Sequence, residues 1–226
     1  MIDKLKQDLQ KYANKDKSLV LSRFFKTGPG QYGEGDKFLG VKVPEQREVA
    51  KKYHKNISFD ELQQLLNSDI HEYRLTAALI LTYKTNKKEV YDFYLKNFKN
   101  INNWDLVDLT APNIVGNYLL DKDRSILYKF ANSTHLWTKR IAILSTFAFI
   151  KNRQYEDSIK ISEILLNDNH DLIHKAVGWM LREIGKKDEK VLIEFLNKHH
   201  KKMPRTMLRY SIERLTEGQR KFYLQR

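Results

Sequence analysis

The sequence predicts an all-α fold, in the form of an α-solenoid built from paired helices. Apolar residues recur at three- and four-residue spacing along nearly the whole chain, and strand-like alternation is scarce. A basic residue followed by small and apolar residues begins a run at Arg140 and again at Lys175, and a related run begins at Thr76. The runs at Arg140 and Lys175 begin 35 residues apart. A repeat of about this length with two helices per unit is typical of α-solenoids, which bury one continuous core and present a concave face. We therefore expect a single domain over residues 1–226.

The individual helices follow from the same periodicity. Pro44 suits the first turn of a helix, where its missing N–H is not needed. Ser58 and Glu61 have the spacing of a capping box, which indicates a helix that begins at Phe59. The expected helices span residues 4–12, 18–26, 44–54, 59–66, 71–83, 88–98, 104–109 continuing to about 120, 124–130, 135–151, 155–166, 171–184, 189–199 and 204–215.

A glycine-rich segment at residues 28–35 interrupts the helical pattern. It holds four of the nine glycines, so we expect a loop there. It lacks the Gly-Lys-Ser/Thr ending of a phosphate-binding P-loop, and no strand precedes it. Two interpretations stay open, a flexible connection and a mobile flap beside a ligand.

The composition excludes several classes of protein. Because the chain has no cysteine, it holds no disulfide, Cys-ligated zinc, iron–sulfur cluster or thiol nucleophile. Its apolar content of 41% is too high for intrinsic disorder. The longest uncharged apolar stretch, residues 141–150, is about half as long as the roughly 20 residues of a membrane span. The first residues also lack the apolar core of a signal peptide, so we expect a cytoplasmic protein without a membrane partner.

The net charge of +13 favours a polyanionic partner, nucleic acid first. Nine basic residues but only two acids lie between residues 198 and 226. Met207, Leu208 and Ile212 alternate with these cations, which predicts helices that fix the positive charges on one surface. Such a surface can follow a phosphate backbone. The alternative is a solvated, charged tail.

Trp179 falls on the polar side of its predicted helix. At about 100° per residue, it lies near Lys175, Arg182 and Lys186 and opposite the apolar face. One interpretation is a tryptophan buried by a neighbouring repeat. The other is an aromatic surface for a base or sugar, among cations that bind phosphates.

Trp104 and Asp108 are four residues apart and therefore share a helix face. A carboxylate that faces phosphates weakens binding through Coulomb repulsion, so Asp108 requires a specific reason to be there. That reason is either local, such as an arginine partner or a helix cap, or chemical. The neighbouring Asp105 lies about 100° away from Trp104 around the helix.

Arg140 lies in a predicted helix that is apolar on almost every side. A buried guanidinium without a partner is costly. It therefore requires either a carboxylate from a neighbouring helix or a phosphate.

The residues singled out above, together with their order and spacing, resemble the AlkD-type DNA alkylation repair enzymes, which are alkylpurine DNA glycosylases built from HEAT-like repeats. The resemblance covers about residues 21–215. It implies a right-handed α-solenoid of HEAT-like helical pairs with a concave basic cleft. Four segments carry it: Phe-Leu-Gly-Val at 38–41 with Pro-Glu-Gln-Arg at 44–47, Trp-Asp-Leu-Val-Asp at 104–108, Trp-Thr-Lys-Arg-Ile-Ala-Ile-Leu at 137–144, and Lys-Ala-Val-Gly-Trp-Met-Leu-Arg-Glu at 175–183.

The resemblance implies base excision repair by hydrolysis of the N-glycosidic bond of positively charged N3- and N7-alkylated purines, without extrusion of the base into a pocket. It places Trp104, Asp108 and Trp179 at the lesioned nucleotide and Arg140 at the DNA backbone. Asp108 would stabilise the oxocarbenium-like sugar and orient the attacking water. The expected partner is double-stranded DNA with alkylated purines, bound by a monomer without metal or cofactor. Further phosphate contacts are expected from the basic residues Lys175, Arg182, Lys186, Arg205 and Arg209.

Two departures from the family pattern bear on the substrate range. Phe24 stands where the best-known form of the family has a tyrosine, and the loop at 28–35 is longer. Tyr32, within this loop, can supply an aromatic hydroxyl, so Phe24 and Tyr32 are candidate lesion-side aromatics. The alternative functions are a non-catalytic helical-repeat protein that binds DNA or structured nucleic acid, and a protein-binding scaffold, which the charge disfavours.

Overall fold

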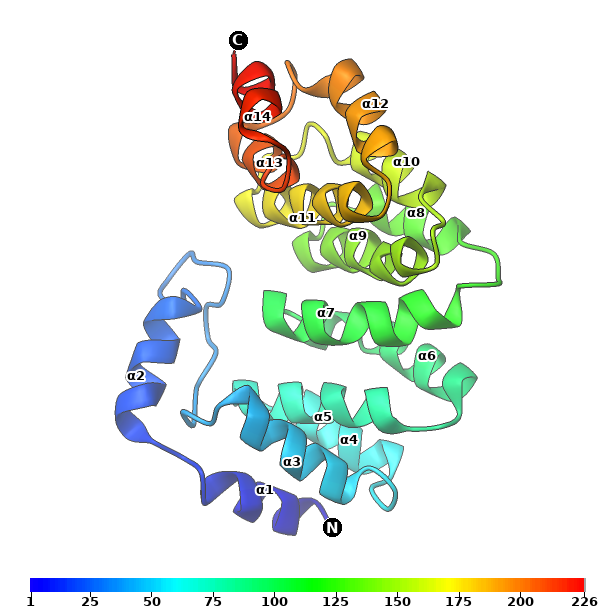
Figure 1. The fold of residues 1–226 in the computed structure, drawn as a ribbon. Coiled ribbons are helices and arrows are strands. Elements are labelled where there is room, and N and C mark those ends of the chain that lie inside the picture. Colours follow the sequence, from blue (N-terminus) through cyan, green and yellow to red (C-terminus); the bar gives the residue numbers. More distant parts are fainter. Residues whose placement is uncertain (226) are drawn as a thin grey trace. The chain divides into compact units, whose positions relative to one another are not determined.

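The computed structural model describes residues 1–225 and confirms the all-α prediction (Figure 1). This part of the chain forms fourteen α-helices and no strand, apart from one isolated bridge between Lys37 and Ile70. The described residues divide into two compact units, the first Met1–Thr110 and the second beginning at Ala111. The predictions of one domain and of a right-handed solenoid with a basic concave cleft stay predictions.

The first unit is organised around α5 (His71–Tyr83), which is buried on nearly all sides. Leu75, Leu79 and Ile80 of this helix are almost fully covered. α3 and α4 pack against α5, and α1 packs against α3. The remaining elements of the unit are α1 (Ile2–Gln10), α2 (Lys15–Phe24), α3 (Val43–Tyr53), α4 (Phe59–Leu66), α6 (Lys87–Lys96), the 3₁₀ turn η1 (Phe98–Asn100) and the start of α7 (Trp104–Ala111).

In the second unit, α9 (Leu136–Lys151) and α11 (Asp171–Lys187) lie side by side (Figure 1). α8 and α10 pack against α9, whereas α12 and α13 pack against α11. α9 is buried almost all round, which explains why its sequence is apolar on nearly every side. The other elements are η2 (Pro112–Gly116), α8 (Ser125–Ala131), α10 (Glu156–Ile164), α12 (Glu189–His199), α13 (Arg205–Ser211) and α14 (Glu217–Leu224).

Glycine allows α11 and α13 to approach closely. A Cβ atom added to Gly178 would lie 2.5 Å from the carbonyl oxygen of Met207, a distance that real side chains essentially never show. A similar close approach occurs at Gly116, where a Cβ would lie 2.2 Å from the carbonyl oxygen of Ser145 in α9. Both glycines are therefore required by packing between helices.

Most expected helices are found with ends shifted by up to three residues, and two stretches differ in kind from the sequence prediction. The helix expected to continue from 104–109 to about 120 does continue to Tyr118, but residues Pro112–Gly116 within it form a π-helical turn. Pro112 has no N–H to donate, which accounts for the change of hydrogen-bond pattern at that point. The helix expected over 204–215 ends at Ser211, and a second helix, α14, begins after Thr216. Thr216 and Gln219 form a capping box that starts α14, a signal of the same kind as the confirmed capping box of Ser58 and Glu61.

The expected loop at residues 28–35 consists of turns and bends. Gly33 ties the loop back to the turn that follows α2, because its backbone N–H donates to the carbonyl of Lys26 at 3.1 Å. The hydroxyl of Tyr32 also donates to the carbonyl of Phe24 at 3.4 Å. Across residues 1–225, no helix combines the length and apolar character needed to cross a membrane.

Candidate functional site

Trp104, the first residue of α7, lies in a cluster of aromatic rings within the first unit. The indole is half-buried, and the ring of Phe25 stacks on it with centroids 5.0 Å apart and planes 9° apart. The ring of Phe24 lies 5.9 Å from the same indole with the planes 77° apart, and Phe24 is 61% exposed. The structure therefore places Phe24 beside Trp104, and Tyr32 is bonded through its hydroxyl to the backbone carbonyl of Phe24.

The aromatic cluster continues inward from Trp104. Phe38 stacks on Phe25 at 5.1 Å, and the imidazole of His71 stacks on Phe38 at 4.6 Å. Stacked and edge-on ring pairs of this kind stabilise a fixed arrangement beyond the area that they bury. One face of the Trp104 indole is therefore supported by Phe25, which limits how the indole can tilt.

Asp108 lies one helical turn after Trp104 on α7 and is half-buried. It contributes a negative charge close to the buried phenol of Tyr94. Burial raises the pKa of Tyr94 above its ordinary value, and the charge of Asp108 adds to this increase. The phenol hydroxyl is held by Thr110 at 3.0 Å, on the turn that follows Asp108. The Trp104–Asp108 face thus combines an indole and a carboxylate, as its four-residue spacing predicts.

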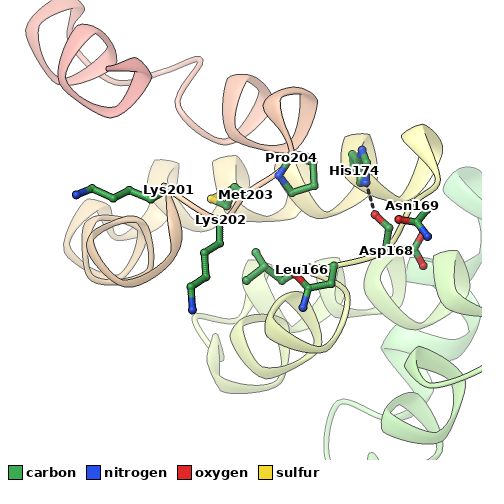
Figure 2. Close-up of a pocket in the computed structure, with 9 residues that line it drawn as sticks. Leu166, Asp168, Asn169, His174, Lys201, Lys202, Met203 and Pro204 are labelled. Atoms are coloured by element: carbon green, nitrogen blue, oxygen red, sulfur yellow. Dashed lines mark hydrogen bonds between the residues drawn. The ribbon is translucent and has the colours of Figure 1, made fainter. Parts of the chain in front are cut away.

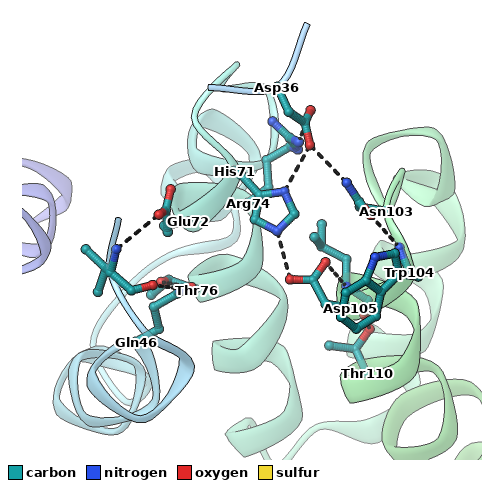
Figure 3. A network of polar contacts seen from close by, with 12 residues as sticks. Asp36, Gln46, His71, Glu72, Arg74, Thr76, Asn103, Trp104, Asp105 and Thr110 are labelled. Carbon is teal, nitrogen blue, oxygen red and sulfur yellow. Dashed lines mark hydrogen bonds and ion pairs between the residues drawn. The ribbon is translucent and has the colours of Figure 1, made fainter. Parts of the chain in front are cut away.

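A buried network of charged groups lies next to this face (Figure 3). The imidazole of His71 faces Asp36 through Nδ1 at 2.9 Å and Asp105 through Nε2 at 2.8 Å. Arg74 donates from Nη2 to Asp36 at 2.6 Å, and Asn103 donates to the same carboxylate at 3.2 Å. Two carboxylates and two basic groups therefore share one buried cluster, which meets the requirement that buried charges be paired.

The protonation of this network follows from its geometry. Burial by itself lowers the pKa of His71, but the adjacent carboxylates of Asp105 and Asp36 outweigh burial and raise it to about 9. Burial raises the pKa of Asp36, and the His71 hydrogen bond and the charge of Arg74 outweigh that effect, so its pKa lies below the ordinary value. At neutral pH, His71 is therefore a cation that donates from both ring nitrogens.

The same network fixes the beginning of α7. Asn103 accepts the backbone N–H of Trp104 through its side-chain oxygen at 2.8 Å. Asp105 accepts from the N–H of Leu106 at 2.9 Å with the oxygen that does not face the imidazole. These bonds satisfy N–H groups at the helix start that have no partner within the helix. The sequence alone did not predict this network, because its members come from three segments, around residues 36, 71–74 and 103–105, that are far apart in the chain.

Glu72 holds the segment Phe-Leu-Gly-Val at 38–41, which contributes to the family resemblance. Its buried carboxylate accepts backbone N–H groups from Leu39 at 2.9 Å, from Gly40 at 2.8 Å and from Val41 at 3.1 Å. Charge-assisted hydrogen bonds of this type are stronger than neutral ones. The segment is thus held at the start of α5, and Phe38 is held in the aromatic cluster.

Trp179 lies on α11 in the second unit and is half-buried. Its ring lies 5.9 Å from that of Phe147 on α9, with the two planes tilted by 47°. Its indole N–H donates to Glu183 at 3.2 Å. Trp179 is therefore neither a fully buried core residue nor an isolated exposed ring.

The cations predicted around Trp179 each have an acidic partner. Lys175 pairs with Asp171 at 2.8 Å, and Lys186 pairs with Glu183 at 2.7 Å. Arg182 pairs with Glu213 and lies 3.7 Å from Glu183. Arg182 and Lys186 lie beside Glu183, which is also the partner of the Trp179 indole, whereas the sequence prediction named no carboxylate in this cluster. All three cations keep some exposure to solvent.

Arg140 is buried, as the apolar helix around it predicts. One of its partners is the backbone carbonyl of Leu172 at the start of α11, which accepts from Nη1. This type of partner was not among the two predicted from the sequence. Arg205 donates to the carbonyl of Leu224 at 3.0 Å and so contacts the end of α14. Arg209 lies exposed on α13, and no ion pair with another residue of 1–225 holds it.

A cavity of about 630 Å³ lies in the second unit, between the loop before α11 and the loop before α13 (Figure 2). Lys201, Lys202 and Pro204 line one part of it, and Asp168 and His174 line another. His174 is bonded to the carbonyl of Asp168, as Figure 2 shows. Among residues 1–225, none assigned to catalysis or DNA binding lines this cavity.

The class of protein follows from comparison with families. The family model for DNA alkylation repair enzymes matches residues 5–215, so the chain belongs to that family. A search of curated proteins found no match.

Solved structures show the same fold. A predicted DNA alkylation repair enzyme from Enterococcus faecalis superposes with a TM-score of 0.72 and 18% identity, over 91% of this chain and 97% of that one. AlkD2 from Streptococcus mutans gives a TM-score of 0.60 and 17% identity, over 89% and 99% of the two chains. The protein smu.31 from Streptococcus mutans UA159 gives 0.59 and 18%, over 86% and 96%.

Proposed function

We propose that the protein is a DNA glycosylase that removes positively charged N3- and N7-alkylated purines by hydrolysis of the N-glycosidic bond. The observation that carries the proposal is the pairing of Trp104 and Asp108 on one face of α7, supported from behind by stacked rings and a buried ion network. A half-buried carboxylate on a chain with net charge +13 fits a role in chemistry better than a role in holding DNA.

The chemistry of the substrate fits this face. An N-alkylated purine carries a positive charge and is already a good leaving group, so little acid catalysis is required. As the glycosidic bond lengthens, positive charge develops on the deoxyribose, and Asp108 stabilises it electrostatically. The same carboxylate orients a water molecule and accepts its proton as the new C–O bond forms. The Trp104 indole favours the cationic sugar through its π-face.

The second unit supplies candidate contacts to the DNA backbone. Lys175, Arg182 and Lys186 are salt-bridged but partly exposed, so a phosphate can exchange with their present carboxylate partners. Within residues 1–225, Arg209 has no such partner to exchange. Binding through these cations would release counterions and fall steeply with salt. We also assign Trp179 to the lesioned nucleotide, and Arg140 and Arg205 to the DNA backbone.

The test uses a duplex with a single N7-methylguanine. Abasic sites are counted after incubation, in single turnover, for the parent protein and for Asp108→Asn. We expect release above the spontaneous rate for the parent and loss of most of it in the variant, by about a hundredfold or more. DNA affinity should stay equal or increase, because the substitution removes a negative charge.

A matched control separates this result from a general effect of charge. Asp92→Asn removes an exposed acid on α6 of the same unit and should keep the parent's rate. Full activity in Asp108→Asn, or no release by the parent, would contradict the proposal. Tight, salt-dependent binding without release would instead support the non-catalytic nucleic-acid-binding alternative.

A further inference from the structure

We propose that His71 is a positioning residue, which holds the first turn of α7 so that Trp104 and Asp108 face the substrate in a fixed geometry. The inference rests on the proposed function for its kinetic consequence. The coupling of His71 to Trp104 follows from hydrogen bonds and ring contacts and does not depend on that function. His71 is itself 1% exposed, so it cannot touch a substrate.

Two hydrogen-bond routes lead from the imidazole to the start of α7. The direct one runs from Nε2 to Asp105, the residue after Trp104. The other runs from Nδ1 to Asp36, from Asp36 to the Asn103 amide, and from Asn103 to the backbone N–H of Trp104. Because both routes end within one residue of Trp104, a shift of the imidazole is transmitted to the indole from two sides (Figure 3).

A third route is formed by stacked rings. The imidazole stacks on Phe38 and lies 4.9 Å from Phe25, and Phe25 in turn stacks on Trp104. His71 thus contacts both the ion network and the aromatic stack. Closely packed side chains transmit displacements because interiors have few voids to absorb them.

The charge on His71 is what makes the arrangement specific. The charged groups that face the imidazole are Asp36 from the loop before α3, Asp105 from α7, and Arg74 through Asp36 from α5. The neighbouring Glu72 is occupied by the backbone N–H groups of residues 39–41. A neutral imidazole has one N–H only, so deprotonation removes the imidazole's hydrogen bond to one of the two carboxylates.

The first experiment reads the position of Trp104 without using activity. In a Trp137→Phe/Trp179→Phe background, Trp104 is the single tryptophan, and its emission is recorded from pH 6 to 10. We expect a change of emission wavelength with a midpoint near the His71 pKa of about 9. With His71→Gln added, this transition should vanish, whereas His54→Gln on the same unit should preserve it. Tyrosine ionisation affects all these proteins alike, so the comparison between them removes it.

The second experiment measures function. His71→Gln in the otherwise unchanged protein should lower the single-turnover rate on N7-methylguanine DNA by about tenfold or more, since small misplacements of catalytic groups are costly. Its DNA affinity should stay within about twofold of the parent, because the cations proposed to bind phosphate belong to the other unit.

The outcomes are separable. An emission profile that is the same with and without the His71→Gln substitution overturns the coupling, and an unchanged rate overturns the positioning role. If the parent releases no base, the proposed function fails, but the emission experiment still decides the coupling. If His71→Gln does not fold, Asp105→Asn replaces it, since this change keeps the Asp36 and Arg74 contacts and should move the midpoint to lower pH.

Discussion

Raising the pH from 6 to 9.5 should remove the stabilisation that protonated His71 gives to the first unit. Its folded-state pKa is about 9 against an ordinary value of 6.5, because burial is outweighed by the carboxylates of Asp105 and Asp36. A raised folded-state pKa means that the folded state binds the proton more tightly. The stabilisation is therefore complete below about pH 6.5 and is lost as the pH rises through about 9. The difference between the two pKa values corresponds to about 3 kcal/mol.

The assay is urea unfolding of the parent and of His71→Gln at several pH values between 6 and 9.5, followed by Trp104 emission in the single-tryptophan background. Lysine and tyrosine residues that titrate in both proteins cancel when the two free energies of unfolding are subtracted. We expect the parent to be the more stable at pH 6. The difference between the two free energies of unfolding should then decrease by about 3 kcal/mol by pH 9.5. A gap that stays constant across this range would refute a protonated His71 in the native state.

Two further predictions concern the second unit. Gly178→Ala should lower the free energy of unfolding by about 1–3 kcal/mol, because the new Cβ would meet the Met207 carbonyl at 2.5 Å. Gly218→Ala, where a Cβ meets nothing within 4 Å, should not destabilise the protein, and thermal unfolding of both variants checks this. Lys186→Gln should reduce the slope of log Kd against log salt for DNA by about one, whereas Lys160→Gln on α10 should leave it unchanged. Equal slopes for the two lysine variants would contradict a contact between Lys186 and the DNA backbone.

Local features of the fold could be predicted from the sequence because they depend on neighbours in the chain. The bounds of α4, α5 and α12 match the prediction residue for residue, since apolar periodicity and caps act over a few positions. The prediction missed α14, although the capping box at Thr216 is a local signal of its start. The π-helical turn was also missed, because a proline such as Pro112 predicts a disturbed helix without specifying its form.

The candidate site could be predicted only in part for a similar reason. The shared face of Trp104 and Asp108 is a property of one helix, so residue spacing is enough to find it. The ion network depends on contacts such as His71 with Asp105, which only the folded chain brings together. Helical periodicity placed Asp105 away from Trp104 but gave no indication of what it would meet. The backbone carbonyl bonded to Arg140 could not be predicted either, because every residue has a main-chain acceptor whatever its side chain.

Glu183 links the groups that surround Trp179 on α11. Its carboxylate accepts from the Trp179 indole and from Lys186, and it also lies 3.7 Å from Arg182. If this surface binds DNA as proposed, an approaching phosphate repels this carboxylate, and its movement releases the Trp179 indole and Lys186 together, whereas Arg182 keeps its partner Glu213. One carboxylate would therefore control the availability of both the indole N–H and the Lys186 ammonium to DNA.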